Sequence, residues 1–250
     1  MSVKMCTLIV SIEPGSRWPV LLASTRDEFR SRGWDPPSEW WPEEHPGVIG
    51  GRDREAGGTW LAANPAERRV AAILNRIEPT GLSDSEAQSR GALPVIAAGG
   101  GSEAIADQDL RLVRPFNLVV AEPGLVTWWR YDGSQPVRQE VPPGLHIVTA
   151  ADLDDMSNPR QRYWLPEFEA ATAPAPRPED RAPGGWGGWP ELLADVDRPY
   201  DDPRALNVRH GGAQGIFGTV SASLLALGEE RLKFEFCPGP PDKAEWERVV

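Results

Sequence analysis

A methionine–cysteine pair near the start of the chain could supply a nucleophile. Cys6 follows Met5 directly, with four residues (MSVK) ahead of that methionine. If translation starts at Met5, removal of the methionine leaves Cys6 with a free α-amino group, so that one residue carries both nucleophile and base. The reference pKa of the amine, roughly 7.7–8.0, is close to that of the thiol, about 8.5. If residues 1–4 remain attached, that nitrogen is an amide, and the alternative interpretation of Cys6 is a buried core thiol.

Charged and amide side chains elsewhere could support such a nucleophile. Arg26 and Asp27 lie in the segment 25–29 (TRDEF), directly after the second predicted strand. An arginine can lower the pKa of a neighbouring thiol, and a carboxylate can orient a free amine. Asn75 ends a later predicted strand and could donate a hydrogen bond to an oxyanion. The alternatives are a local ion pair for the charged block and a turn-forming role for the asparagine.

Paired strands dominate the elements that would position these residues. Apolar runs bounded by turn residues predict strands at residues 6–12, 19–25, 59–63, 69–75, 116–122, 125–131, 145–150, 220–227 and 231–236. Because these strands come in pairs without β-α alternation, they favour an α+β fold with antiparallel sheets.

Two helices and two long loops complete the predicted elements. A capping box at residues 83–86 (SDSE) predicts a helix through residues 88–98, which Pro94 would kink or divide. Residues 157–171 predict a second helix, with a proline in its first turn. Loops are predicted at residues 31–46 and in the Pro/Gly-rich stretch 172–190, which we interpret as a loop insertion in a single domain spanning 1–250.

The composition limits the classes of partner. A net charge of −11 argues against a nucleic-acid or anionic-membrane surface, and no apolar run approaches the roughly 20 residues of a membrane span. Two cysteines without a secretory context indicate reduced thiols in the cytoplasm. The three histidines lack companions at metal-ligand spacing. Eleven tryptophans indicate either a Trp-rich core or an aromatic pocket for a flat or apolar ligand.

Several blocks together resemble the TANGO2 family, also called the NRDE family after its Asn-Arg-Asp-Glu motif. They occur in the family's order and cover most of the chain except 172–190. The matching stretches are residues 5–7 with the following apolar strand, 25–29, 57–61 (GGTWL), 72–75, 116–118 (FNL) and, more weakly, 218–225.

The Met-Cys start of this family is similar to that of cysteine N-terminal nucleophile hydrolases such as bile salt hydrolase and penicillin V acylase. The resemblance implies an αββα sandwich with two stacked antiparallel sheets between helical layers. It implies Cys6 as nucleophile, Arg26 and Asp27 as its supports, and Asn75 as oxyanion donor. Because Arg26 and Asp27 are closer in sequence than their counterparts in the acylases, Glu28 competes with Asp27 for its role.

Three positions depart from the family pattern. Thr25 replaces the first asparagine of the motif, Ala150 replaces the asparagine of a Ser-Asn-Ala block, and Val220 replaces the arginine of a Gly-Thr-Arg block. The last two changes remove an amide donor and a cation. An oxyanion donor can contribute roughly 3–4 kcal/mol to lowering a barrier, so these changes leave the efficiency of an acylase open.

The resemblance implies two alternative functions for the same pocket. The first is hydrolysis of, or acyl transfer from, an amide or thioester of a small apolar acyl compound. The second is non-catalytic binding and trafficking of haem or of a lipid or acyl-CoA. A third interpretation, separate from the resemblance, is a degenerate scaffold that binds a protein partner. No cofactor is predicted, since haem would be a transported ligand, and the oligomeric state is left open.

Overall fold

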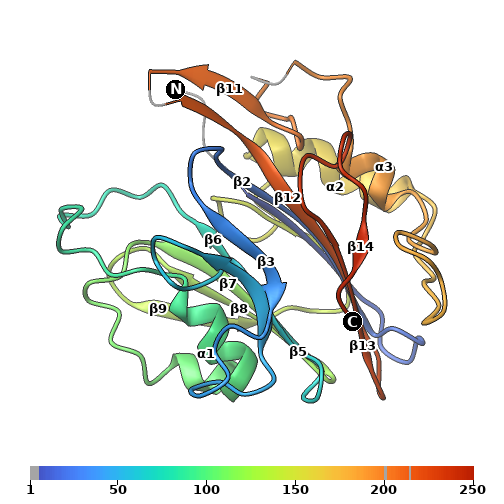
Figure 1. Ribbon diagram of the computed structural model, residues 1–250, viewed down its shortest axis with the longest axis horizontal. Coiled ribbons are helices and arrows are strands. Elements are labelled where there is room, and N and C mark those ends of the chain that lie inside the picture. The colour runs from blue at the N-terminus through green and yellow to red at the C-terminus, as the bar shows by residue number, and fades with distance from the viewer. Residues whose placement is uncertain (1–5, 200–201, 214) are drawn as a thin grey trace.

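Two antiparallel seven-stranded sheets stack on one another in the computed structural model of this protein (Figure 1). The structure describes residues 6–199, 202–213 and 215–250, so Met5, the predicted start residue, lies outside the described part of the chain. The outer faces of the sheets carry the helices α1 (Ala92–Gly100) on one sheet and α2 (Pro159–Ala170) and α3 (Trp189–Leu193) on the other. These layers confirm the predicted α+β sandwich.

The first sheet contains both ends of the described chain. Its order is β10-β1-β2-β12-β13-β14, and β11 pairs with β12. The strands are β1 (Thr7–Ile12), β2 (Val20–Phe29), β10 (Gly144–Val148), β11 (Arg209–Gly212), β12 (Gly215–Leu227), β13 (Leu232–Cys237) and β14 (Glu247–Arg248). Strand β2 pairs with the long strand β12 along the whole length of β2, from Val20 to Phe29.

The second sheet follows the chain order from β3 to β9. Its strands are β3 (Trp34–Ser38), β4 (Ile49–Asp53), β5 (Leu61–Asn64), β6 (Arg69–Asn75), β7 (Phe116–Glu122), β8 (Leu125–Tyr131) and β9 (Pro136–Glu140). Helix α1 and the short 3-10 helix η1 (Ser102–Ile105) lie in the connection between β6 and β7. Among the described residues, no helix is long and apolar enough to cross a membrane.

Side-chain alternation along β1 and β2 separates the apolar layers. Leu8 and Leu22 point between the sheets and pack with residues of the second sheet such as Val119. Ile9 and Ala23 point to the other face and pack under α2 and α3. A third apolar layer lies between the second sheet and α1. On β1 and β2, even-numbered residues therefore face the gap between the sheets, and odd-numbered residues face the helices.

Most of the tryptophans serve the core. Buried indole rings are those of Trp18, Trp128, Trp129, Trp164, Trp186 and Trp189. Three of them, Trp164, Trp186 and Trp189, are each 1% exposed and fill the layer under the helices. The unusual tryptophan content therefore mainly reflects core packing.

The Pro/Gly-rich stretch 172–190 is fixed to the first sheet through a buried ion pair. The Lys233 ammonium lies 2.9 Å from the Glu235 carboxylate and donates to the carbonyl of Arg177 at 2.9 Å. The indole N–H of Trp186 donates to the other carboxylate oxygen of Glu235 at 2.7 Å. Helix α3 begins within this stretch, which was predicted to be all loop.

Asn117, the central residue of the Phe-Asn-Leu block, is fully buried and fastens β7 to the segment after β10. Its amide nitrogen donates to the carbonyls of Thr149 at 2.9 Å and Ala151 at 2.7 Å. Its amide oxygen accepts from the indole of Trp128 at 3.1 Å and the guanidinium of Arg76 at 2.9 Å. This block is therefore structural.

Several predicted boundaries are wrong, and the strand predicted to begin at Val220 begins at Gly215. Strand β2 continues to Phe29, so the charged block 25–29 lies inside this strand, because pairing with β12 satisfies its backbone. The loop at 31–46 contains β3, whose two prolines lie at an irregularity on the edge of the second sheet.

The helix predicted from the capping box begins only at Ala92. The Ser83 N–H does donate to the Glu86 carboxylate at 3.0 Å, but these residues form a turn. Gln88 instead makes a bridge with Val113, so tertiary pairing overrides the local signal. Pro94 lies in the first turn of α1, where its missing N–H has no intrahelical acceptor, and it does not divide the helix.

Candidate active site

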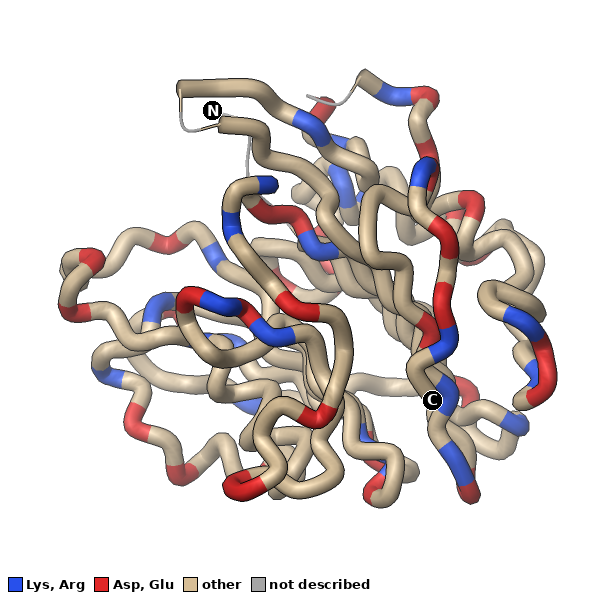
Figure 2. Tube along the Cα trace, viewed as in Figure 1, with Lys and Arg blue, Asp and Glu red and all other residues tan. Residues whose placement is uncertain are grey.

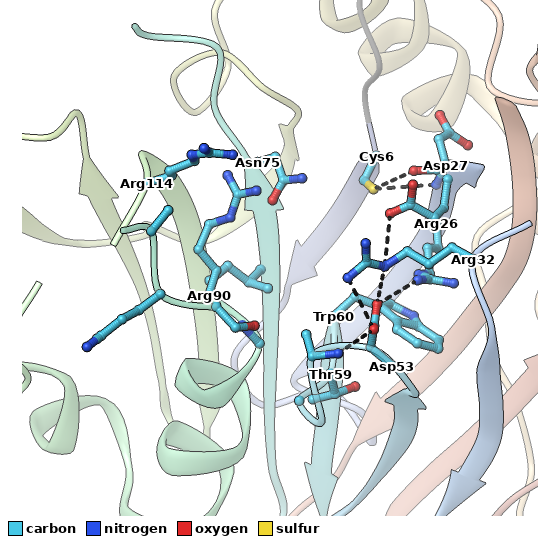
Figure 3. A pocket seen from close by; sticks show the side chains of 18 of the residues that line it. Cys6, Arg26, Asp27, Arg32, Asp53, Thr59, Trp60, Asn75, Arg90 and Arg114 are labelled. Carbon is cyan, nitrogen blue, oxygen red and sulfur yellow. Dashed lines mark hydrogen bonds and ion pairs between the residues drawn. The ribbon is translucent and has the colours of Figure 1, made fainter. Parts of the chain in front are cut away.

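The pairing of β1 with β2 places the cysteine thiol against the backbone of the charged block. Cys6 immediately precedes β1, and its sulfur accepts a hydrogen bond from the Asp27 N–H at 3.4 Å (Figure 3). The Asp27 carbonyl lies 3.8 Å from the same sulfur. Burial, reinforced by the negative charge of Asp27, raises the pKa of the Cys6 thiol to about 12. The thiol is therefore protonated at neutral pH.

Arg26 faces the gap between the sheets, as expected for an even-numbered residue of β2. Its guanidinium lies 3.4 Å from the Asp53 carboxylate at the end of β4 and 4.1 Å from the ring centre of Trp60. Burial lowers the pKa of Arg26 from its ordinary value. The ion pair and the ring hold this cation beside the cysteine.

Asp27 points its carboxylate away from the gap, toward α2. Thr219 donates to one carboxylate oxygen at 2.7 Å, and Arg160 of α2 lies 3.4 Å from the other. Burial raises the pKa of Asp27 to about 6, against the opposing effects of Arg160 and Thr219. The contact of Asp27 with the cysteine sulfur is thus made by its main chain.

Glu28 presents a carboxylate on the opposite face of β2 from Asp27. Its oxygen lies 3.9 Å from the Arg32 Nε, and both residues line the same cavity. Of the two acidic residues in the block, Glu28 is therefore the one whose side chain faces the gap between the sheets.

A cavity of about 410 Å³ brings all four predicted residues together. Cys6, Arg26 and Asp27 form one wall, and Asn75, exposed at the end of β6, lies on the other (Figure 3). The remaining lining residues are Glu28, Arg32, Asp53, Ala56, Gly58, Thr59, Trp60, Ile73, Asp84, Ala87, Gln88, Ser89, Arg90, Gly91 and Arg114. Each sheet thus contributes one side of the cavity.

Sequence reasoning missed Asp53, which organises the arginines of the first wall. Its carboxylate accepts from Arg32 at 2.5 Å and from Arg26 at 3.4 Å. Its second oxygen accepts from the N–H groups of Glu55 at 3.0 Å and Ala56 at 2.9 Å. An aspartate between two arginines at the end of a strand carries no local signal for this role, because its arginine partners are more than twenty residues away in sequence.

The three departures from the family pattern lie at different places. Thr25 is buried in the middle of the first sheet, paired with Thr7. Ala150 lines a separate cavity of about 500 Å³. Val220 is the extra residue of a bulge in β12, between residues paired with Asp27 and Arg26.

The stacked antiparallel sheets, the outer helices and the cysteine at the head of β1 define the N-terminal nucleophile hydrolase fold. Among 34 matching chains of solved structures is a cysteine-to-alanine mutant of conjugated bile acid hydrolase from Clostridium perfringens. It superposes with a TM-score of 0.50 at 10% sequence identity, over 98% of this chain and 96% of the hydrolase. At this identity the likeness establishes the fold alone.

The family model for TANGO2, Transport and Golgi organisation 2, matches residues 5–175. The chain belongs to this family, as its ordered motifs predicted. No curated protein matches the sequence significantly.

Proposed function

We propose that the protein is a cysteine N-terminal nucleophile hydrolase or acyltransferase for an amide or thioester of a small acyl compound. The observation that carries this proposal is the cavity itself, which gathers the Cys6 sulfur, a main-chain N–H, the Arg26 cation and the Asn75 amide. Its volume of about 410 Å³ lies near the lower end of the roughly 300–1,000 Å³ range of ligand pockets, so the substrate is small.

The reaction requires a free α-amino group on Cys6. That amine takes the thiol proton as the sulfur attacks the carbonyl carbon, and returns it to the leaving amine or thiol when the acyl bond breaks. Arg26 and the Asp27 N–H stabilise the thiolate, while Asn75 donates to the oxyanion. Water then hydrolyses the acyl-cysteine thioester, or a second nucleophile accepts the acyl group.

The test compares two forms of the N-terminus. One protein starts at Met5, so that removal of methionine exposes Cys6, and the other retains residues 1–4. Intact mass verifies each N-terminus, and an acyl-thioester probe reports acylation of the protein by mass. We expect acylation of Cys6 in the first form alone, and loss of acylation in Cys6→Ala. Acylation that persists in Cys6→Ala refutes the proposal.

A second candidate function is binding of haem or a lipid without turnover, which requires the cavity but no thiolate. Cys237 is fully buried, with its sulfur 3.5 Å from the carbonyls of Gly239 and Ala244, so it does not offer a thiolate to haem iron. Titration with haem, followed at the Soret band, tests this candidate. Absence of saturable binding at micromolar protein would exclude haem.

A further inference from the structure

Two arginines from the second sheet's side of the cavity are not used by the proposed reaction. Arg90 and Arg114 lie with Asn75 on the wall opposite Cys6 (Figure 3). Both come from the connection between β6 and β7, in which Arg90 lies two residues before the first residue of α1 and Arg114 two residues before β7.

A close backbone contact holds the Arg90 segment at this wall. A Cβ on Gly58 would lie 2.3 Å from the carbonyl carbon of Gly91, so only glycine permits this approach. The Thr59 N–H donates to the Gly91 carbonyl at 2.9 Å. The Arg90 side chain is held as well, because its guanidinium Nη1 donates to the Pro115 carbonyl at 3.1 Å. The Gly-Gly-Thr-Trp block thus positions Arg90 at the cavity.

The positive charge at this wall has little compensation. Within the described part of the chain, no carboxylate lies at ion-pair distance from Arg90, and Arg114 pairs only with Asp84, whose side chain is 97% exposed. A pair this exposed is worth about 0–1 kcal/mol. Burial, together with the charge of Arg114, lowers the pKa of Arg90 to about 10. The arginines of the other wall, in contrast, share the Asp53 carboxylate.

Two guanidinium groups against the one carboxylate of Asp84 make this wall locally cationic, while Glu28, which lines the same cavity, favours the charged form of Arg90. The chain carries a net charge of −11, and Figure 2 shows Lys and Arg interspersed with Asp and Glu along the loops. An anion would therefore bind where guanidinium groups gather and face a cavity, since their planar forks match carboxylate and phosphate oxygens.

We propose that Arg90 and Arg114 bind an oxyanion group, such as a carboxylate or a phosphate, on the substrate, across the cavity from the bond that Cys6 attacks. The substrate class is thus an acyl amide or thioester that carries an anionic group on either its acyl part or its leaving part. The identity of that bond rests on the proposed function, whereas binding of the anion does not.

The test measures binding without turnover, by calorimetry on full-length Cys6→Ala protein. Two matched pairs of ligands exchange a carboxylate for a neutral carboxamide of the same size: N-hexanoylglycine against its carboxamide, and adipic acid monoamide against adipamide. We expect the anion of at least one pair to bind tenfold or more tightly than its neutral partner, with affinity falling as salt increases. The phosphonate analogue of N-hexanoylglycine then shows whether carboxylate or phosphate oxygens are preferred, and either order supports the subsite.

Variants connect this preference to the two arginines. Arg90→Met and Arg114→Met should each reduce the preference for the anion at least fivefold, and Arg90→Lys should retain part of it. Arg111→Met is the matched control, because that side chain is 86% exposed and does not line the cavity. Circular dichroism checks the fold of each variant.

Less than threefold preference for the anion in both pairs would overturn the subsite, as would equal effects of Arg90→Met and Arg111→Met. Failure of the proposed function gives a different result, because the anion is then still preferred in Cys6→Ala while native protein with a free Cys6 amine forms no acyl-cysteine. The two ideas can therefore fail separately.

Discussion

Replacing Asn117 by alanine tests whether the Phe-Asn-Leu block is structural. Its amide makes four hydrogen bonds of 2.7–3.1 Å in a fully buried position. Asn117→Ala removes these bonds and leaves the carbonyls of Thr149 and Ala151 and the Trp128 indole without that partner. At about 1 kcal/mol per bond, with a further penalty for each buried group left unsatisfied, the loss in unfolding free energy is roughly 3–5 kcal/mol.

Urea unfolding followed by tryptophan fluorescence measures this loss. With a slope of about 2–3 kcal/mol per M, the midpoint should fall by roughly 1–2 M. Asn75→Ala is the matched control, because Asn75 is exposed and should change the unfolding free energy by less than about 0.5 kcal/mol. A loss below about 1 kcal/mol in Asn117→Ala, or an equal loss in both variants, would refute the reasoning.

Three further predictions concern titration and buried charge. In protein that retains residues 1–4, the pKa of the Cys6 thiol is raised to about 12, so this thiol should react with iodoacetamide at pH 8 at least a hundredfold more slowly than a free thiol. Peptide mapping measures the alkylation of Cys6 over time, and alkylation at the rate of a free thiol would contradict the prediction. Asp154, 2.7 Å from His146, raises the pKa of His146. The stability lost in His146→Gln should therefore be largest below pH about 6.5 and disappear as the pH rises through the folded pKa. Urea midpoints that fall equally at pH 5.5 and pH 9 would count against this prediction. Lys233→Met leaves the buried Glu235 carboxylate without its cation and should lower the unfolding free energy by about 3–5 kcal/mol in urea titrations, whereas the exposed control Lys243→Met should change it little.

Turn chemistry made part of the fold predictable. Strands β6, β7 and β8 have their predicted bounds because Asn-Pro and Pro-Gly turns mark where neighbouring apolar runs end. Strand β4, with two consecutive glycines, and β3, with two prolines, carry no strand signal of their own. They exist because neighbouring strands pair with them, which a local pattern does not encode.

The candidate site was predictable on the Cys6 side and, on the opposite wall, at Asn75. Cys6, Arg26 and Asp27 are named by motifs, and strand pairing brings them together. The direction of the Asp27 side chain was not predictable, because it depends on β2 continuing through the charged block. Asp53 and Arg90 reach the cavity through long-range packing, for which a single sequence contains no signal.

The two walls of the cavity belong to different sheets, and this gives the site two parts that can vary separately. If Arg90 and Arg114 bind the ligand as proposed, substitutions in the connection between β6 and β7 should change ligand preference without disturbing the β1–β2 pairing that holds the cysteine. A ligand that touches both walls also joins the two sheets, so its binding should raise the resistance of the sandwich to unfolding.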